Sequence, residues 1–173
     1  MYLLINGQNF LLDYSNKIKK RFSKIIKVNY INYIEDYAHH PEEIKSILNS
    51  LFYNKKKTIT VFEPHNIKRL KTLEEKFMTS FYKTDILINT NLFLKKNCYN
   101  NNYSIKFIKK IQYINCNSFY FKNKILIEKY LLKTGLINDY ILFLGAGGIF
   151  EIINKVIKNI NIRKYMSIVK KTS

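Results

Sequence analysis

All three histidines and both prolines of the 173-residue chain lie in two short segments. The first is 36–41, Asp-Tyr-Ala-His-His-Pro, and the second is 62–65, Phe-Glu-Pro-His. An imidazole can exchange a proton near neutral pH, and a neighbouring carboxylate can fix its orientation. Asp36 could orient a histidine in this way, and Arg69 could bind a carboxylate or a phosphate. The spacing therefore predicts a polar site in which the two segments face each other across one edge of a sheet.

These histidines also have a purely structural interpretation. His39 and His40 could cap a helix, and His65 could be an ordinary residue at the end of a strand. Metal binding is disfavoured, because consecutive histidines rarely direct both rings to one tetrahedral centre and the chain has no His-Glu-x-x-His pattern. Nucleophilic catalysis lacks a Gly-x-Ser-x-Gly elbow. We therefore predict no metal site and assign no catalytic residue.

The turn 145–148, Gly-Ala-Gly-Gly, could offer backbone N–H groups to a phosphate at the start of a helix. It lacks the full Gly-x-Gly-x-x-Gly spacing, so tight packing of a strand against a helix explains it better. No glycine is followed by lysine, which excludes a Gly-x-x-x-x-Gly-Lys loop for a nucleoside triphosphate. Cys98 and Cys116 lack metal-type spacing and are predicted to be free thiols.

The periodicity of apolar residues predicts the elements that position these segments. Runs of β-branched and aromatic residues predict two strands within 21–38, and others at 58–62, 85–88, 113–115 and 140–144. Helical spacing predicts helices from Pro41 and from Ile149, and over 68–82, 105–111 and 123–133. The polar stretch 89–103 predicts a long irregular loop. This alternation indicates an α/β fold, a Rossmann-like, mostly parallel sheet with helices on both faces.

Composition limits the class of protein. Hydrophobic residues make up 47% of the chain, which predicts a packed core, and the length fits a single domain. The net charge is +18, but lysine dominates and accompanies asparagine and isoleucine, which share AT-rich codons, so the charge is weak evidence for nucleic-acid binding. The longest nearly uncharged stretch, 140–150, is too short to cross a membrane, and residues 1–10 lack secretory features. We expect a cytoplasmic protein.

Two motifs carry a resemblance to a family. Segment 33–44, Tyr-Ile-Glu-Asp-Tyr-Ala-His-His-Pro-Glu-Glu-Ile, resembles the signature that opens the C-terminal domain of Mur ligases, in the version of the UDP-N-acetylmuramate–L-alanine ligases. Segment 61–65, followed by Arg69, is similar to the second motif of that version. The basic residues at 19–22 and the turn at 144–147 also resemble parts of this domain. The resemblance covers 17–160 and leaves 161–173 as a basic tail.

The resemblance implies a Rossmann-like third domain of an ATP-dependent ligase of peptidoglycan synthesis, in a single-domain chain, 1–173, without the N-terminal and central ATP-binding domains. It implies that Arg21 and Asp36 lie near the nucleotide. It also implies four residues around L-alanine and the product carboxylate: Tyr37, His39, His65 and Arg69. ATP and Mg²⁺ would be bound mainly by the absent domains, so the partner would be a separate chain that carries the UDP-sugar and ATP sites; otherwise the gene is a remnant.

Three residues depart from the family pattern: Lys20 and Asn66 replace arginines, and Gly148 replaces an acid. The loop after Ile88 also lacks the acidic, proline-containing segment of the family. We expect each change to weaken an anion contact or a helix cap. Two other functions remain open: a murein-tripeptide recycling ligase, which shares the double histidine, and a basic nucleic-acid-binding module, which we consider unlikely.

Overall fold

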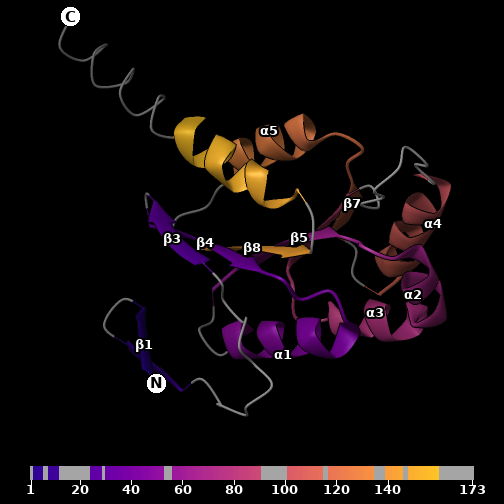
Figure 1. Cartoon of the computed structure of the whole chain (residues 1–173), viewed down its shortest axis with the longest axis horizontal. Helices are drawn as coiled ribbons and strands as arrows, with labels where there is room; N and C mark the ends of the chain where they lie inside the picture. The colour runs from indigo at the N-terminus through magenta and orange to yellow at the C-terminus, as the bar shows by residue number, and fades with distance from the viewer. Residues whose placement is uncertain are drawn as a thin grey trace, which may run out of the picture.

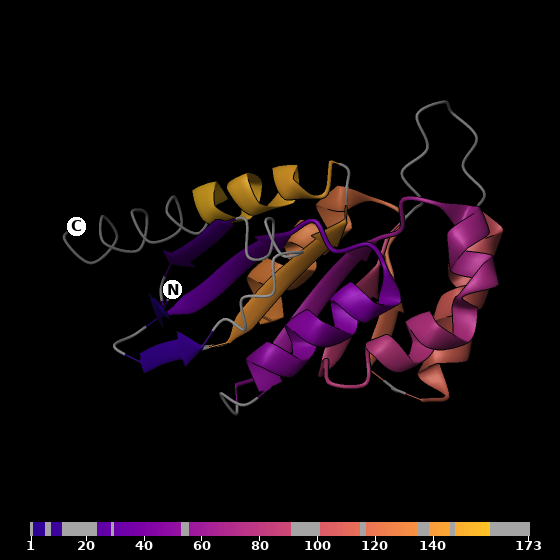
Figure 2. The same cartoon turned by 60° about the horizontal axis from the view of Figure 1, so that its bottom comes forward.

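The computed structural model describes residues 2–5, 8–11, 24–28, 30–52, 56–90, 101–114, 117–134, 139–145 and 148–159. Six strands form one sheet in the order β3-β4-β8-β5-β6-β7 (Figures 1 and 2). Their bounds are Lys24–Val28, Ile31–Asp36, Tyr140–Gly145, Thr58–Glu63, Ile86–Asn89 and Ser118–Tyr120, in that order. Only β3 pairs antiparallel to its neighbour, which confirms the predicted mostly parallel sheet.

Helices cover both faces of the sheet, as predicted (Figure 1). One face carries α1 (Pro41–Phe52), α2 (Ile67–Thr72), α3 (Glu74–Ser80) and α4 (Asn101–Gln112). The other carries α5 (Lys124–Thr134) and the helical residues 150–159. This division follows from right-handed crossovers: the chain moves toward β7 through α1 to α4 and returns to β8 through α5.

The core has two layers, one on each side of the sheet. The central strand β8 serves both: Tyr140, Leu142 and Leu144 pack toward α1, α3 and α4, whereas Ile141 and Phe143 pack toward α5. All six residues of β8 are buried, which is why its sequence is a continuous apolar run rather than an alternating one.

The predicted helix over 68–82 is wrong as a single element. The chain forms α2 and α3, with a break at Leu73, whose φ of −112° and ψ of 25° leave the helical region. The apolar spacing continues across the break, because Leu70, Phe77 and Phe81 are all buried. The spacing of buried residues therefore predicted the buried face correctly but could not predict the change of direction.

The predicted strand at 113–115 and part of the predicted loop at 89–103 are also wrong. Tyr113 and Ile114 are exposed in a turn, and the strand lies later, at Ser118–Tyr120. Asn89 ends β6, and 101–103 belong to α4, while 91–100 lie outside the described residues. The strand was misplaced because only three residues form β7, and the start of α4 was missed because this helix begins with two asparagines.

A hairpin at the start of the chain was not predicted. Strands β1 (Tyr2–Ile5) and β2 (Gln8–Leu11) pair antiparallel in a separate two-stranded sheet. The dipeptide Asn6-Gly7 between two apolar runs is a strong hairpin signal and could have indicated it. Arg21, both cysteines and the segment 161–173 lie outside the described residues, so the predictions for them stay predictions. No helix in the described part of the chain has the length and hydrophobicity to cross a membrane.

Candidate functional site

The two histidine segments meet at the carboxyl edge of the sheet. Strands β4 and β5 lie on either side of β8, with Asp36 in register with Leu144 and Glu63 with Gly145. The segments that leave these two strand ends approach each other, so that the rings of His39 and His65 lie 6.4 Å apart, edge to face. The predicted juxtaposition of the two segments is confirmed.

His39 is fixed by its own segment. Its Nδ1 lies 2.9 Å from the carbonyl oxygen of Tyr37, and the Tyr37 ring packs against it at 5.2 Å, edge to face. The carboxylate of Glu43, in the first turn of α1, accepts hydrogen bonds from the backbone N–H groups of both His39 and His40. This is the reciprocal half of a helix cap, so folding of α1 also sets the backbone that carries the imidazole.

The carbonyl of Tyr37, rather than the carboxylate of Asp36, provides the contact at Nδ1 of His39. Asp36 is buried at the end of β4, and its Oδ1 accepts a hydrogen bond of 2.8 Å from the backbone N–H of Ala38. This bond turns the chain from the strand toward the histidines. The predicted orientation of a histidine by Asp36 and its predicted place near a nucleotide both stay predictions.

Arg69 lies at the start of α2, just after His65. The side chain of Asn66 caps this helix, since its Oδ1 accepts a hydrogen bond from the N–H of Arg69. The replacement of a family arginine by Asn66 therefore adds a helix cap rather than weakening one. The Nη1 atom of Arg69 is buried and has no hydrogen-bond partner among the residues described. A buried guanidinium nitrogen without a partner can bind an anionic oxygen.

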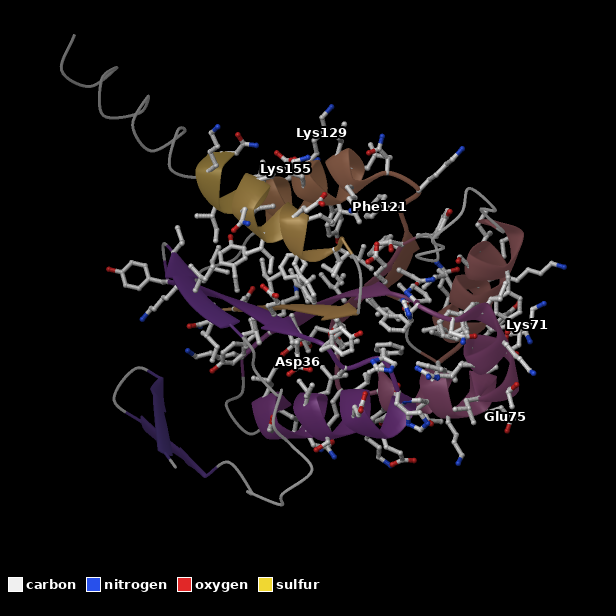
Figure 3. All side chains as sticks on the ribbon, in the orientation of Figure 1. Asp36, Lys71, Glu75, Phe121, Lys129 and Lys155 are labelled. Carbon is white, nitrogen blue, oxygen red and sulfur yellow. The ribbon has the colours of Figure 1, made fainter. Side chains whose placement is uncertain are left out.

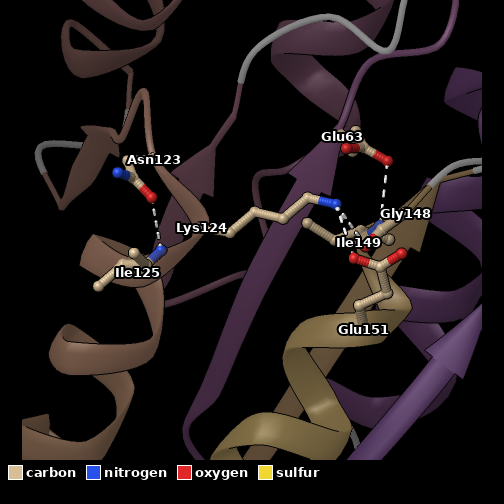
Figure 4. Close-up of polar contacts among 7 residues, drawn as sticks. All are labelled: Glu63, Asn123, Lys124, Ile125, Gly148, Ile149 and Glu151. Carbon is tan, nitrogen blue, oxygen red and sulfur yellow. Dashed lines mark hydrogen bonds and ion pairs between the residues drawn. The ribbon is translucent and has the colours of Figure 1, made fainter.

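Glu63, the last residue of β5, contacts the start of the helical residues 150–159 (Figure 4). Its Oε2 accepts a hydrogen bond of 3.2 Å from the backbone N–H of Ile149, at the start of the helical residues 150–159. Lys124 reaches across from α5, donates to the carbonyl of Gly148 at 2.8 Å and lies 3.5 Å from Glu151. Sequence analysis missed Glu63 and Lys124, because their contacts join positions far apart in the chain.

The carboxylate of Glu63 caps the start of the helical residues 150–159 from a distant strand. Burial raises the pKa of Glu63, while Lys124 and the Ile149 N–H partly oppose this change. Because the Ile149 N–H already donates to a carboxylate of the chain itself, the described part of this helix start does not fit a phosphate cradle. The expected effect of Gly148 on an anion contact or a cap stays a prediction.

Gly145 requires glycine for two reasons. Its φ of +148° is unfavourable for other residues, and a Cβ there would lie 2.8 Å from the backbone oxygen of Glu63. The close packing of β8 against the end of β5 explains this glycine. Across the described residues, no group of three or more His, Cys, Asp or Glu side chains is arranged to hold a metal ion.

Comparison with known proteins gives consistent results. No family model matches the chain. The UDP-N-acetylmuramate–L-alanine ligase of Borreliella burgdorferi is 36% identical over 140 residues, which are 77% of this chain and 29% of that protein. A murein peptide ligase of Psychrobacter arcticus superposes with a TM-score of 0.66 at 18% identity, over 80% of this chain and 29% of that one. A MurF ligase of Thermotoga maritima in complex with ADP gives 0.58 at 16%, over 80% and 31%.

The fold, with two histidine segments that meet at one edge of the sheet, defines a Rossmann-like α/β domain. Mur ligases carry a domain of this type as their C-terminal domain. The chain belongs to the Mur ligase family, and the curated relatives it matches are UDP-N-acetylmuramate–L-alanine ligases. It spans less than a third of the length of those three relatives.

Proposed function

We propose that this chain is the amino-acid-presenting domain of a UDP-N-acetylmuramate–L-alanine ligase of peptidoglycan synthesis, and that it acts in the cytoplasm with a second chain and not by itself. The observation that carries the proposal is the meeting of His39 and His65 beside Arg69, whose buried Nη1 has no partner in the described structure. The identity to alanine-adding ligases, 36% over most of the chain, favours alanine as the amino acid.

The proposed chemistry is positioning. Tyr37, His39 and His65 would line the site of the amino acid, and Arg69 would bind its carboxylate or that of the product. Orientation of two reactants can lower a barrier by about 7–11 kcal/mol in the best cases. In the proposed reaction an amine meets an activated carboxylate, and the main contribution of this domain would be to position the amine. We assign no nucleophile and no general base to the chain.

ATP and Mg²⁺ would be bound by the second chain. The described helix start at Ile149 does not fit a phosphate, because Glu63 already accepts its backbone N–H. The absence of a Gly-Lys pair in the sequence agrees with this. The roles of Arg21 and Asp36 near a nucleotide belong to the proposal. In this arrangement, residues 17–160 form the working domain and 161–173 a basic tail.

The proposal is tested by completing the enzyme. The chain is mixed with a chain that carries the UDP-sugar and ATP-binding domains, and ATP-dependent joining of L-alanine to UDP-N-acetylmuramate is measured. Turnover by the mixture, and by neither chain separately, is expected. No turnover with any candidate second chain would favour a remnant. Preference for the murein tripeptide over alanine would instead identify a recycling ligase.

Nucleic-acid binding is the less favoured alternative. Such a module needs a continuous basic face, but the exposed lysines lie on both sides of the sheet. Lys71, on α2, lies apart from Lys129, on α5, and Lys155, on the helical residues 150–159 (Figure 3). A steep loss of RNA or DNA affinity with rising salt would contradict this conclusion.

A further inference from the structure

Two fully buried polar side chains make no hydrogen bond with the described parts of the chain. Asn89, at the carboxyl end of β6, has neither its Nδ2 nor its Oδ1 paired, and the hydroxyl of Ser104, in the first turn of α4, is also unpaired. Leaving a buried polar group unpaired costs about 1–3 kcal/mol. Two such groups at one edge of the sheet are therefore unfavourable for stability by themselves.

Both side chains face the same side of the sheet. Asn89 is in register with Phe62, which packs in the layer under α1, α3 and α4, as does Leu87, two residues before Asn89. Side chains alternate along a strand, so Asn89 points into this layer. Ser104 precedes Phe107 and Ile108 of the same layer by one helical turn, so its hydroxyl also points toward the sheet.

Arg69 belongs to the same edge. Helix α2 follows β5, and α4 follows β6, so the first turns of both helices lie at the carboxyl ends of adjacent strands. In Figures 1 and 2, α2 and α4 lie side by side at this end of the molecule. The three elements α2, β6 and α4 thus bring buried polar atoms without partners in the described structure to one end of the sheet: Nη1 of Arg69, the Asn89 amide and the Ser104 hydroxyl.

We infer that Asn89 and Ser104 extend the Arg69 site into a receptor for the α-carboxylate and α-ammonium groups of a free amino acid. This inference rests on the proposed function. Arg69 Nη1, Asn89 Nδ2 and the Ser104 hydroxyl offer donors for a carboxylate, whereas Asn89 Oδ1 offers an acceptor for an ammonium group. An inorganic anion would leave that acceptor unpaired. Phe62 and Phe107 in the same layer favour a short apolar side chain on the ligand.

The chain contains a matched control for Asn89. Asn32, on β4, is 1% exposed, and both its amide atoms also lack partners in the described structure. It is in register with Tyr140 at the amino end of the sheet, away from Arg69. Replacing either asparagine by leucine removes a buried amide at similar volume, so both N89L and N32L should raise the midpoint of thermal unfolding. Only N89L should alter ligand binding.

The test is a calorimetric titration of the full chain with L-alanine, propionate and ethylamine. We expect L-alanine to bind at least tenfold more tightly than either fragment, and N89L to weaken alanine at least tenfold while N32L leaves its affinity unchanged. S104A should weaken it severalfold, and N89A provides a second variant if leucine disturbs the packing.

Equal alanine affinity of N89L, N89A and the natural chain would overturn the inference, as would propionate binding as tightly as alanine. Failure of the natural chain to bind alanine would also overturn it. That result would not contradict the proposed function, because turnover by the mixture with the second chain is measured separately.

Discussion

The rings of His39 and His65 lie 6.4 Å apart, although the strands from which their segments leave are not neighbours. Strand β8 lies between β4 and β5, and the 25 residues between the two histidines include the whole of α1. The pair therefore forms across β8, the last strand in the described part of the chain, which is inserted between two earlier ones. In the proposed ligase, we therefore expect substitutions in either segment to affect the site.

Substitution of the paired histidines should affect the amino-acid step. In the mixture with the second chain, H39A or H65A is expected to lower kcat/KM for alanine at least tenfold, about 1.4 kcal/mol of transition-state stabilisation. His40 is the matched control, because it lies next to His39, is also partly exposed and stands outside the ring pair. Equal losses in H40A and H39A would show that the pair has no specific role.

Gly145 and Gly148 should respond differently to alanine. G145A places a methyl group 2.8 Å from a backbone oxygen at a φ of +148°, so we expect a loss of about 2–3 kcal/mol in the free energy of unfolding. G148A meets only the flexible end of Lys124, at 2.5 Å, and that side chain can move. Chemical denaturation of the two variants measures the difference, and equal losses would contradict it.

Glu63 should make stability depend on pH. Its pKa is raised in the fold, chiefly by burial, so the folded chain binds the proton more tightly than the unfolded chain. Stability should therefore fall as the pH rises from the unfolded pKa of about 4.3 through the folded value. E63Q keeps an oxygen for the Ile149 N–H but cannot ionise. Denaturation of both proteins between pH 4 and 7 should show the decline in the natural chain and a flatter profile in E63Q.

Tyr103 should contribute more than Lys110 to the docking of α4 on α3. Its hydroxyl donates to Glu74 at 2.7 Å in a partly buried position, whereas the Lys110 side chain is 55% exposed where it meets the same carboxylate. We expect Y103F to cost about 1 kcal/mol of unfolding free energy and K110M to cost less than half of that. A larger loss in K110M would reverse this assignment.

Much of the fold could be predicted from local pattern. The helix at Pro41 follows from its acidic first turn, and the strand at Tyr140 from a continuous apolar run. The break at Leu73 could not be predicted, because the residues on either side keep one helical spacing of buried side chains. The position of β7 was missed because only three residues form that strand, which is too short a run to show a clear alternation.

The sequence by itself indicated the two segments that meet at the candidate site, because all three histidines and both prolines gather there and Arg69 follows the second segment. The tertiary structure decided what each of them contacts. Glu63 caps a helix 86 residues further along, Asn66 caps the helix of Arg69, and Asn89 is buried without a partner in the described structure. The first and last of these depend on the order of the strands, which is fixed by burial of both faces of the sheet and not by any local sequence signal.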